Sequence, residues 1–219
     1  MKIIRFCLYL SALSSFTSLF AQGKSSTERL FPQFEKGTVF LKNGGQASAA
    51  LNYDMIQQQM LFLDSDSTEM KIADPLNVVI VKIGERRFLP ASSEGAFYEE
   101  IQVGEGSFFV QRIAFELSAG KAAGYGGYSQ TQSSTSYGSL QTRGNNVKLN
   151  SGDKFVMVTD SVYYLQSGNK YKKFYSAKTL GKLFKGHESE IKTFADKESI
   201  NFRKMEDVAR IVEYGYSLK

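Results

Sequence analysis

Residues 77–90 read NVVIVKIGERRFLP, a β-branched run followed by a Gly-Glu turn and a second apolar segment that stops at a proline. A continuous run such as Asn77–Ile83 is typical of a strand buried on both faces. The turn at Gly84-Glu85 sends the chain straight back through Arg86–Leu89, so these two strands are expected to pair antiparallel. This hairpin predicts that a β-sheet forms the body of the protein.

Further hairpins flank this one along the chain. Upstream, Thr38–Leu41 is followed by Asn43-Gly44-Gly45, a strong hairpin-turn signal. Downstream, Phe97–Val103 and Phe108–Leu117 flank a glycine-containing turn. No long helical pattern separates the strands between residues 37–118, so we expect one antiparallel β region, a meander that could curl into an open barrel.

The composition changes abruptly over residues 119–146, where Gly, Ser, Thr, Gln and Tyr dominate and no periodic hydrophobic residue occurs. This low-complexity tract predicts a long mobile loop. Its tyrosines, Tyr125, Tyr128 and Tyr137, are mixed with Ser and Gly, as in adaptable recognition loops. We therefore expect these three residues to contact a ligand or a protein partner.

Residues 147–175 carry further strands of the same domain, and residues 176–219 switch to a helical period. Ser176 is a candidate N-cap at the start of that segment. Three short helices are expected, over Ala177–Phe184, Glu188–Lys197 and Lys204–Ser217. The expected fold class is therefore α+β or mainly β, an antiparallel meander followed by a C-terminal bundle of short helices.

The N-terminus has the three parts of a secretory signal peptide. Two basic residues precede residues 6–20, an uncharged apolar run, and the small residue Ala21 ends it. An uncleaved anchor is the alternative, but the run is shorter than the roughly 20 residues of a spanning helix. We expect a signal peptide over 1–21, a flexible leader over 22–36, and a mature protein that is periplasmic or extracellular and not integral to the membrane.

Composition excludes several kinds of chemistry. Cys7, the only cysteine, lies in the signal peptide, so the mature chain has no disulfide, thiolate nucleophile or cysteine-ligated metal. The mature chain carries 25 basic and 22 acidic residues, a net charge of +3, without a basic stripe typical of nucleic-acid binding. His187, the only histidine, has no partners for a triad or a zinc site. We expect no metal, no cofactor and no nucleic acid.

Carboxylates and glycines offer weak motifs. Asp64–Glu69 alternates oxygen ligands as calcium loops do, but it lacks the glycine and distant glutamate of an EF-hand, so a hairpin turn is expected. Gly124–Gly127 is not followed by the Lys-Ser/Thr of a phosphate loop. Glu99 and Glu100 are adjacent on a strand and must face opposite sides, so at least one is expected to be a solvated edge residue. No catalytic residue is assigned.

These observations favour an exported, non-enzymatic cell-envelope protein that binds an envelope protein or a small apolar ligand. The alternative is a hydrolase acting on an envelope polymer through carboxylates such as Glu99 or Asp160. A third hypothesis, an integral outer-membrane barrel, is disfavoured by the helical C-terminal segment and by an ending in Ser217-Leu218-Lys219 rather than an aromatic strand.

A set of apolar and helix-capping residues marks the C-terminal third: Lys182-Leu183-Phe184, Glu190-Ile191-Lys192, Phe194, Ile200, Phe202, Glu206-Asp207, Ile211 and Tyr214. In these residues the chain resembles a group of exported, uncharacterised proteins of Gram-negative bacteria. The β segment also resembles that group, through Leu51-Asn52-Tyr53 and through Val81-Lys82-Ile83 leading to Phe88. The resemblance implies a shared fold and an envelope location, and it implies no catalytic residue.

Limited proteolysis of the folded protein checks the loop prediction. Proteases cut exposed loops of small and polar residues first, so the first cleavage is expected within Lys121–Gly144. Mass spectrometry of the earliest fragments locates the cut. A first cleavage elsewhere, with this tract still intact, would contradict the loop prediction.

Overall fold

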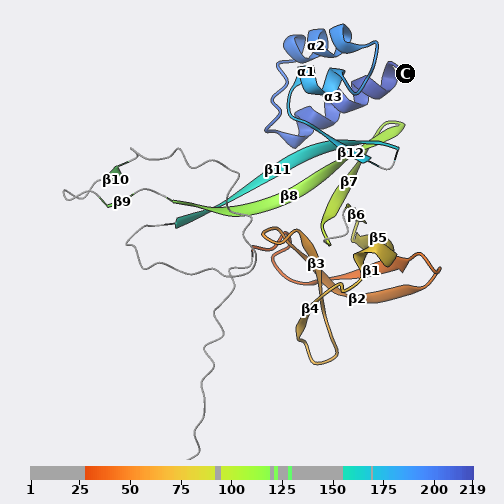
Figure 1. Cartoon of the computed structure of the whole chain (residues 1–219), viewed down its shortest axis with the longest axis vertical. Helices are drawn as coiled ribbons and strands as arrows, with labels where there is room; N and C mark the ends of the chain where they lie inside the picture. The colour runs from red at the N-terminus through yellow and green to blue at the C-terminus, as the bar shows by residue number, and fades with distance from the viewer. Residues whose placement is uncertain (1–27, 92–94, 119–120, 123–127, 130–154, 169) are drawn as a thin grey trace, which may run out of the picture.

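The computed structural model describes residues 28–91, 95–118, 121–122, 128–129, 155–168 and 170–219. Within them, ten strands form one antiparallel sheet, and three α-helices follow at the C-terminal end (Figure 1). The chain is therefore mainly β with C-terminal helices, as the sequence predicts. None of the described helices is both long and apolar enough to cross a membrane.

The ten strands of the sheet, in chain order, are β1 (Glu35–Leu41), β2 (Gln46–Asp54), β3 (Gln59–Leu63), β4 (Glu69–Lys71), β5 (Val78–Ile83), β6 (Arg86–Pro90), β7 (Phe97–Val103), β8 (Gly106–Ser118), β11 (Phe155–Ser167) and β12 (Lys170–Phe174). Their spatial order is β12-β11-β8-β7-β6-β5-β1-β2-β3-β4. The order departs from a simple meander at β1, which lies between β5 and β2. A 3-10 turn, η1 (Pro75–Asn77), precedes β5, and β9 (Lys121–Ala122) pairs with β10 (Tyr128–Ser129) in a separate small sheet.

The large sheet is open but strongly curled. Its edge strands, β12 and β4, do not pair with each other, so it does not close into a barrel. The turn between β2 and β3 nevertheless reaches across to β7 and β8. The backbone N–H of Ala114 donates to the carbonyl of Met55 at 2.9 Å, and that of Phe97 donates to the carbonyl of Gln58 at 3.0 Å. These bonds hold the N-terminal strands folded over one face of the sheet.

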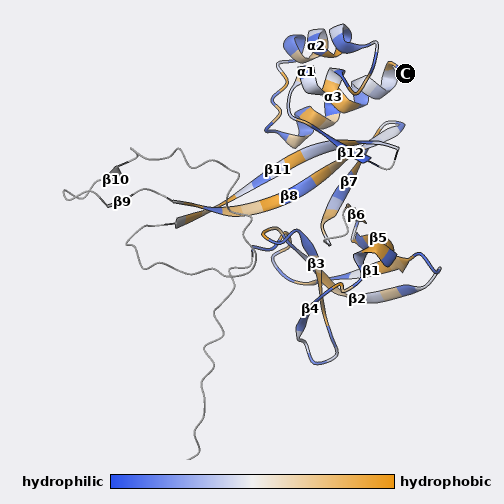
Figure 2. Ribbon diagram, viewed as in Figure 1, coloured by the Kyte–Doolittle hydropathy of each residue, from blue (hydrophilic) through white to orange (hydrophobic). Residues whose placement is uncertain are grey.

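Two hydrophobic cores share that face. The N-terminal core packs side chains of β1, β2, β3, β5 and β6 with Phe97 and Ala114. The C-terminal core packs the three helices against the other ends of β7 and β8 and against β11 and β12, with Phe108 and Phe174 fully buried. Figure 2 shows hydrophobic colouring along β5 and on parts of α3. Residues at alternate positions of β7 therefore serve both cores, because side chains two apart point to one face of a strand.

The helices are α1 (Ala177–Gly181), α2 (Glu188–Lys197) and α3 (Met205–Ser217). The predicted N-cap is present, since the Ser176 hydroxyl accepts from the backbone N–H of Thr179. The first helix ends three residues earlier than predicted. Bonds from Leu183 N–H to the Leu180 carbonyl and from Phe184 N–H to the Gly181 carbonyl tighten the chain there. This tight turn places the ring of Phe184 in the C-terminal core, where it is 1% exposed.

Part of the segment predicted to be a flexible leader is anchored to the sheet. Phe31 is 7% exposed and belongs to the N-terminal core. The buried amide of Asn52 holds it, because its oxygen accepts from the Phe31 N–H and its nitrogen donates to the carbonyls of Phe31 and Gln33. The physical reason for the difference is that this amide supplies the hydrogen bonds that a strand partner would otherwise give.

Helix α3 docks on the turn between β7 and β8 through Tyr216. Its hydroxyl donates to the carbonyl of Ser107 at 2.8 Å, and its ring lies against Gly106. A Cβ at Gly106 would overlap that ring, although the backbone there does not have a positive φ. The close approach of the helix therefore requires glycine.

Replacing Gly106 with alanine is expected to lower the free energy of unfolding by about 1–3 kcal/mol, because the added methyl group overpacks the contact. Urea unfolding measures the change. In a Tyr216→Ala background the same replacement should cost much less, since the ring is gone. An equal cost in both backgrounds would show that the backbone, not the ring, is responsible.

Candidate functional site

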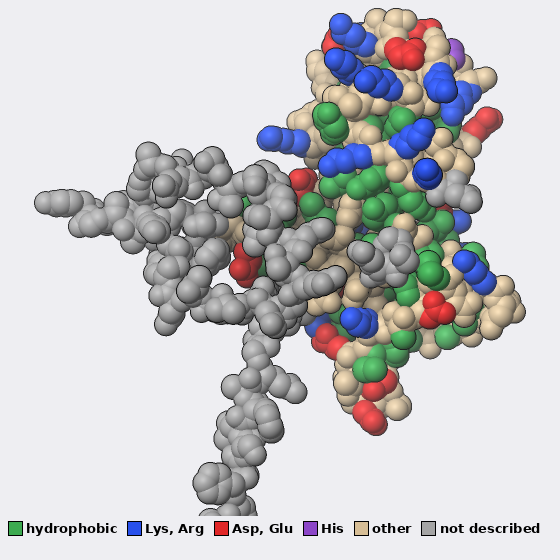
Figure 3. Space-filling view, in the orientation of Figure 1, with side chains coloured by type: hydrophobic (Ala, Val, Ile, Leu, Met, Phe, Trp, Pro, Cys, Tyr) green, Lys and Arg blue, Asp and Glu red, His purple; other side chains and the backbone are tan. Residues whose placement is uncertain are grey.

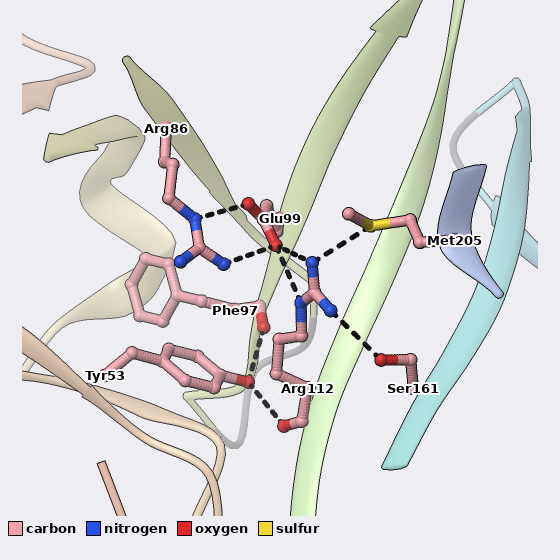
Figure 4. Close-up of polar contacts among 7 residues, drawn as sticks. All are labelled: Tyr53, Arg86, Phe97, Glu99, Arg112, Ser161 and Met205. Atoms are coloured by element: carbon pink, nitrogen blue, oxygen red, sulfur yellow. Dashed lines mark hydrogen bonds and ion pairs between the residues drawn. The ribbon is translucent and has the colours of Figure 1, made fainter. Parts of the chain in front are cut away.

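A buried carboxylate lies where the two cores meet. Glu99, in the middle of β7, is 3% exposed. Arg86 on β6 binds it in a bidentate manner, with Nε donating to Oε1 at 2.6 Å and Nη2 donating to Oε2 at 2.8 Å. Arg112 on β8 donates to Oε2 from Nε at 2.8 Å (Figure 4). Three neighbouring strands are thus joined through one carboxylate.

The two guanidinium groups extend this cluster in both directions. Arg112 donates from Nη1 to the Ser161 hydroxyl on β11 at 3.1 Å, and its Nη2 lies 3.1 Å from the sulfur of Met205, the first residue of α3. On the other side, Arg86 lies over two rings of the N-terminal core, 5.0 Å from the Phe31 centroid and 5.6 Å from the Phe88 centroid. Side-chain contacts from this cluster therefore reach five elements of the fold.

The environment of Glu99 favours a permanent ion. Burial raises the pKa of its carboxyl, but the hydrogen bonds and charges of Arg86 and Arg112 outweigh burial, so the pKa lies below its usual range. Both carboxylate oxygens accept hydrogen bonds from guanidinium groups, which hold the carboxylate in place between the strands. The geometry points to a structural role for Glu99.

The other carboxylates of the hydrolase hypothesis do not complete a catalytic pair with Glu99. Glu100 faces the opposite side of β7 and forms an ion pair with Arg87 at 2.9 Å. The expectation of a solvated edge residue is wrong, because β7 lies inside the sheet and both side chains are paired. Asp160 is exposed and accepts from the N–H of Ser161 at 2.7 Å. Within the described ranges, no group of His, Cys, Asp and Glu is arranged to hold a metal ion.

An apolar hollow of about 680 Å³ opens on the N-terminal part of the sheet. It is bounded by β1, β2, β3, the turn after β3, and the chain from Ile72 to Val78. Its floor belongs to the N-terminal core, where Leu51 and Val78 are at most 1% exposed. Half-buried Leu41 and Phe62 also line it.

Small side chains at alternate positions of β2 explain why the hollow is open. Ala47, Ala49 and Leu51 line the hollow from alternate positions, so their side chains share one face of the strand. The two alanines are small, and the neighbouring Val39 and Phe62 do not fill the volume that larger residues would occupy. The sequence pattern of small and apolar residues at alternate positions was the available signal for this hollow, and sequence analysis did not use it.

Polar residues form the remainder of the lining: Ser48, Asp64, Ser65, Asp74 and Asn77. Asp64 begins the turn expected from the sequence, and its Oδ1 accepts from the N–H groups of Asp66 at 2.9 Å and Thr68 at 2.8 Å. A calcium loop is not needed to explain this segment, because the backbone amides already use that oxygen. The lining is thus mainly apolar with a minority of polar groups, which is the usual character of a small-molecule site.

An aromatic cluster covers the opposite face of the sheet. Tyr98 and Tyr164 stack with centroids 4.8 Å apart, and Tyr171 contacts Tyr98 at 5.1 Å and Phe109 at 4.9 Å. Phe109 is 2% exposed beneath them. Figure 3 shows hydrophobic side chains, a class that includes tyrosine in its colouring, gathered below the helices. These rings pack on one another across neighbouring strands of the sheet.

Of the three tyrosines predicted to contact a partner, one lies in a described strand. Tyr125 and Tyr137 lie outside the described residues. Tyr128 lies in β10, where its backbone pairs with Ala122 of β9. His187 precedes α2 without a capping hydrogen bond from its side chain, and its Nδ1 is 3.5 Å from Glu190.

Comparison of the chain with protein-family models, with curated proteins and with solved structures found no match. Function is therefore inferred from the geometry, in which the hollow combines volume, an apolar floor and a polar rim.

Replacing Glu99 with glutamine is expected to lower the free energy of unfolding by about 3–5 kcal/mol, because two guanidinium groups would lose their buried counter-ion. Glu100→Gln is the matched control on the neighbouring residue. Its partner Arg87 is largely exposed, so its loss should cost at most about 1 kcal/mol. Equal costs for the two variants would contradict the structural role of Glu99.

The Glu99 contribution should also depend on pH. A carboxyl whose pKa is lower in the folded state stabilises the fold above its unfolded pKa of about 4.3. That contribution is lost as the pH falls through the lower pKa of the folded state. The difference in unfolding free energy between wild type and Glu99→Gln should therefore be constant near neutrality and shrink below about pH 4. Urea unfolding at several pH values measures it.

Proposed function

We propose that this chain is an exported, non-enzymatic binding protein of the cell envelope that holds a small apolar ligand in the hollow of its N-terminal sheet. The observation that carries the proposal is the hollow itself, with its floor of buried Leu51 and Val78 and its rim of polar groups. Export is inferred from the basic, apolar and small-residue pattern of residues 1–21.

The size of the hollow suits a small molecule. Its volume of about 680 Å³ falls in the range of roughly 300–1,000 Å³ that is usual for ligand sites. The floor is rigid, because Leu51 and Val78 are packed in the N-terminal core and β1 is paired with strands on both sides. A site of this kind does not have to be built when the ligand arrives, which reduces the entropic cost of binding.

The main source of affinity would be the hydrophobic effect. Each methylene group moved from water into the hollow contributes about 0.8 kcal/mol before other costs. Affinity should therefore rise with the length of an alkyl chain until the hollow is full. The buried ion cluster and the stacked tyrosines do not compete as ligand sites, because their polar atoms and ring faces are engaged within the protein.

Binding of the neutral fluorescent probe N-phenyl-1-naphthylamine tests the proposal. The purified mature protein should raise its emission with a saturable curve. Ala49→Trp should weaken the binding at least about tenfold, because an indole ring would occupy space that the ligand needs.

Ala50→Trp provides the matched control, since Ala50 is the next residue on β2 and does not line the hollow. It should bind the probe as the wild type does. Thermal unfolding of both variants establishes that each is folded. Absence of saturable binding by the wild type, or equal effects of the two variants, would refute the assignment of the hollow as the ligand site.

A further inference from the structure

All the charged residues that line the hollow are acidic. Two of its fifteen lining residues, Asp64 and Asp74, are acidic, and none is basic. Neither carboxylate forms a salt bridge with a described residue. A charged group of a ligand that sits at this rim would therefore meet carboxylates as its nearest charged partners in the lining.

The two carboxylates differ in how they are held. Oδ1 of Asp64 accepts from two backbone N–H groups, which fixes the side chain in the turn. Asp74 precedes the turn η1 but makes no capping hydrogen bond with its side chain, and it is exposed. Asp74 is therefore free to turn toward a cationic group at the mouth of the hollow.

The part of the chain that surrounds the hollow also has a negative net charge. Residues 28–118 contain 8 basic and 13 acidic residues, a net charge of −5, although the whole chain has a net charge of +5. Residues 170–219 contain 12 basic and 7 acidic residues, a net charge of +5. Figure 3 shows Lys and Arg side chains gathered over the helices, with fewer of them over the N-terminal strands. The hollow thus lies in a part of the chain with a net negative charge, whereas the C-terminal part has a net positive charge.

Two lysines lie close to the rim along the chain and must be weighed. Lys42 follows the lining residue Leu41, and Lys71 precedes Ile72. Both are exposed, and neither lines the hollow. Exposed charges outside the site are screened by water and salt more strongly than groups at the mouth of an apolar hollow.

We propose that the natural ligand is an amphiphile with an apolar chain and a cationic head group, which places the chain in the hollow and the head group between Asp64 and Asp74. This inference rests on the proposed function and specifies its ligand class. A cationic amphiphile should bind roughly 3- to 10-fold more tightly than an anionic one with the same chain, since each partly exposed ion pair contributes a small factor.

Three ten-carbon probes test the charge preference: decyltrimethylammonium, decanol and decyl sulfonate, all below their micelle concentrations. Each is titrated against the full mature protein carrying N-phenyl-1-naphthylamine, and its dissociation constant is obtained from displacement. The expected order of affinity is cation, then neutral, then anion. The preference should shrink at 1 M salt, where the screening length is only about 3 Å.

The rim assignment is tested by Asp74→Asn and by Asp64→Asn combined with it. Asparagine keeps the oxygen that accepts the turn hydrogen bonds of Asp64, so the fold should persist. These variants should lose the charge preference and still bind decanol. Asp66→Asn, in the same turn but outside the lining, is the control and should keep the preference.

The outcomes separate the two proposals. Failure of all three probes and of the fluorescent dye to bind would overturn the proposed function. Binding of all three with equal affinity, or tightest binding of the sulfonate, would overturn the inference about the head group and leave the hollow as a binding site. A cation preference that survives the double substitution would also overturn it, because the charge would then reside outside the rim.

Discussion

The buried carboxylate of Glu99 is the constraint on which the rest of the structure depends. Two guanidinium groups, from strands on either side of β7, satisfy both of its oxygens. Removing one member of a buried ion cluster leaves an uncompensated charge, so all three must be in place together. Because Arg112 also reaches Ser161 and Met205, and Arg86 lies over rings of the N-terminal core, the cluster fixes how the two cores meet.

That junction divides the sheet into two parts that differ in what packs against them. On the C-terminal side, the helices cover one face of β7, β8, β11 and β12, and the glycine at position 106 lets α3 approach the strands. On the N-terminal side none of the described α-helices packs against the sheet. There the strands curl, and the β2–β3 turn bonds back to Phe97 and Ala114. The hollow lies on this uncovered side, where small side chains at alternate positions of β2 leave volume.

Charge follows the same division. The N-terminal strands are acidic and the helical end is basic, so the net charge of the whole chain conceals two regions of opposite sign. Under the proposed function, an apolar hollow with carboxylates at its rim would provide both a hydrophobic driving force and a preference for a cationic ligand. Binding would need no moving part and no catalytic group, in keeping with a carboxylate at Glu99 that is held as an ion.

Local sequence patterns were sufficient to predict several secondary-structure elements of this protein. The β-branched run at 77–83, the turn at Asn43-Gly44-Gly45 and the cap at Ser176 each act through neighbours in the chain, and they formed a strand, a turn and a helix start as expected. The prediction that the strand is buried on both faces is wrong, because Val79 is 48% exposed and Lys82 is also exposed. Tertiary structure decided what depends on residues far apart: the insertion of β1 between β5 and β2, the anchoring of Phe31 by Asn52, the pairing of Glu99 with Arg86 and Arg112, and the hollow. Sequence periodicity shows which side of a strand a residue occupies, but not which strand lies beside it, because pairing is set by the packing of the whole sheet.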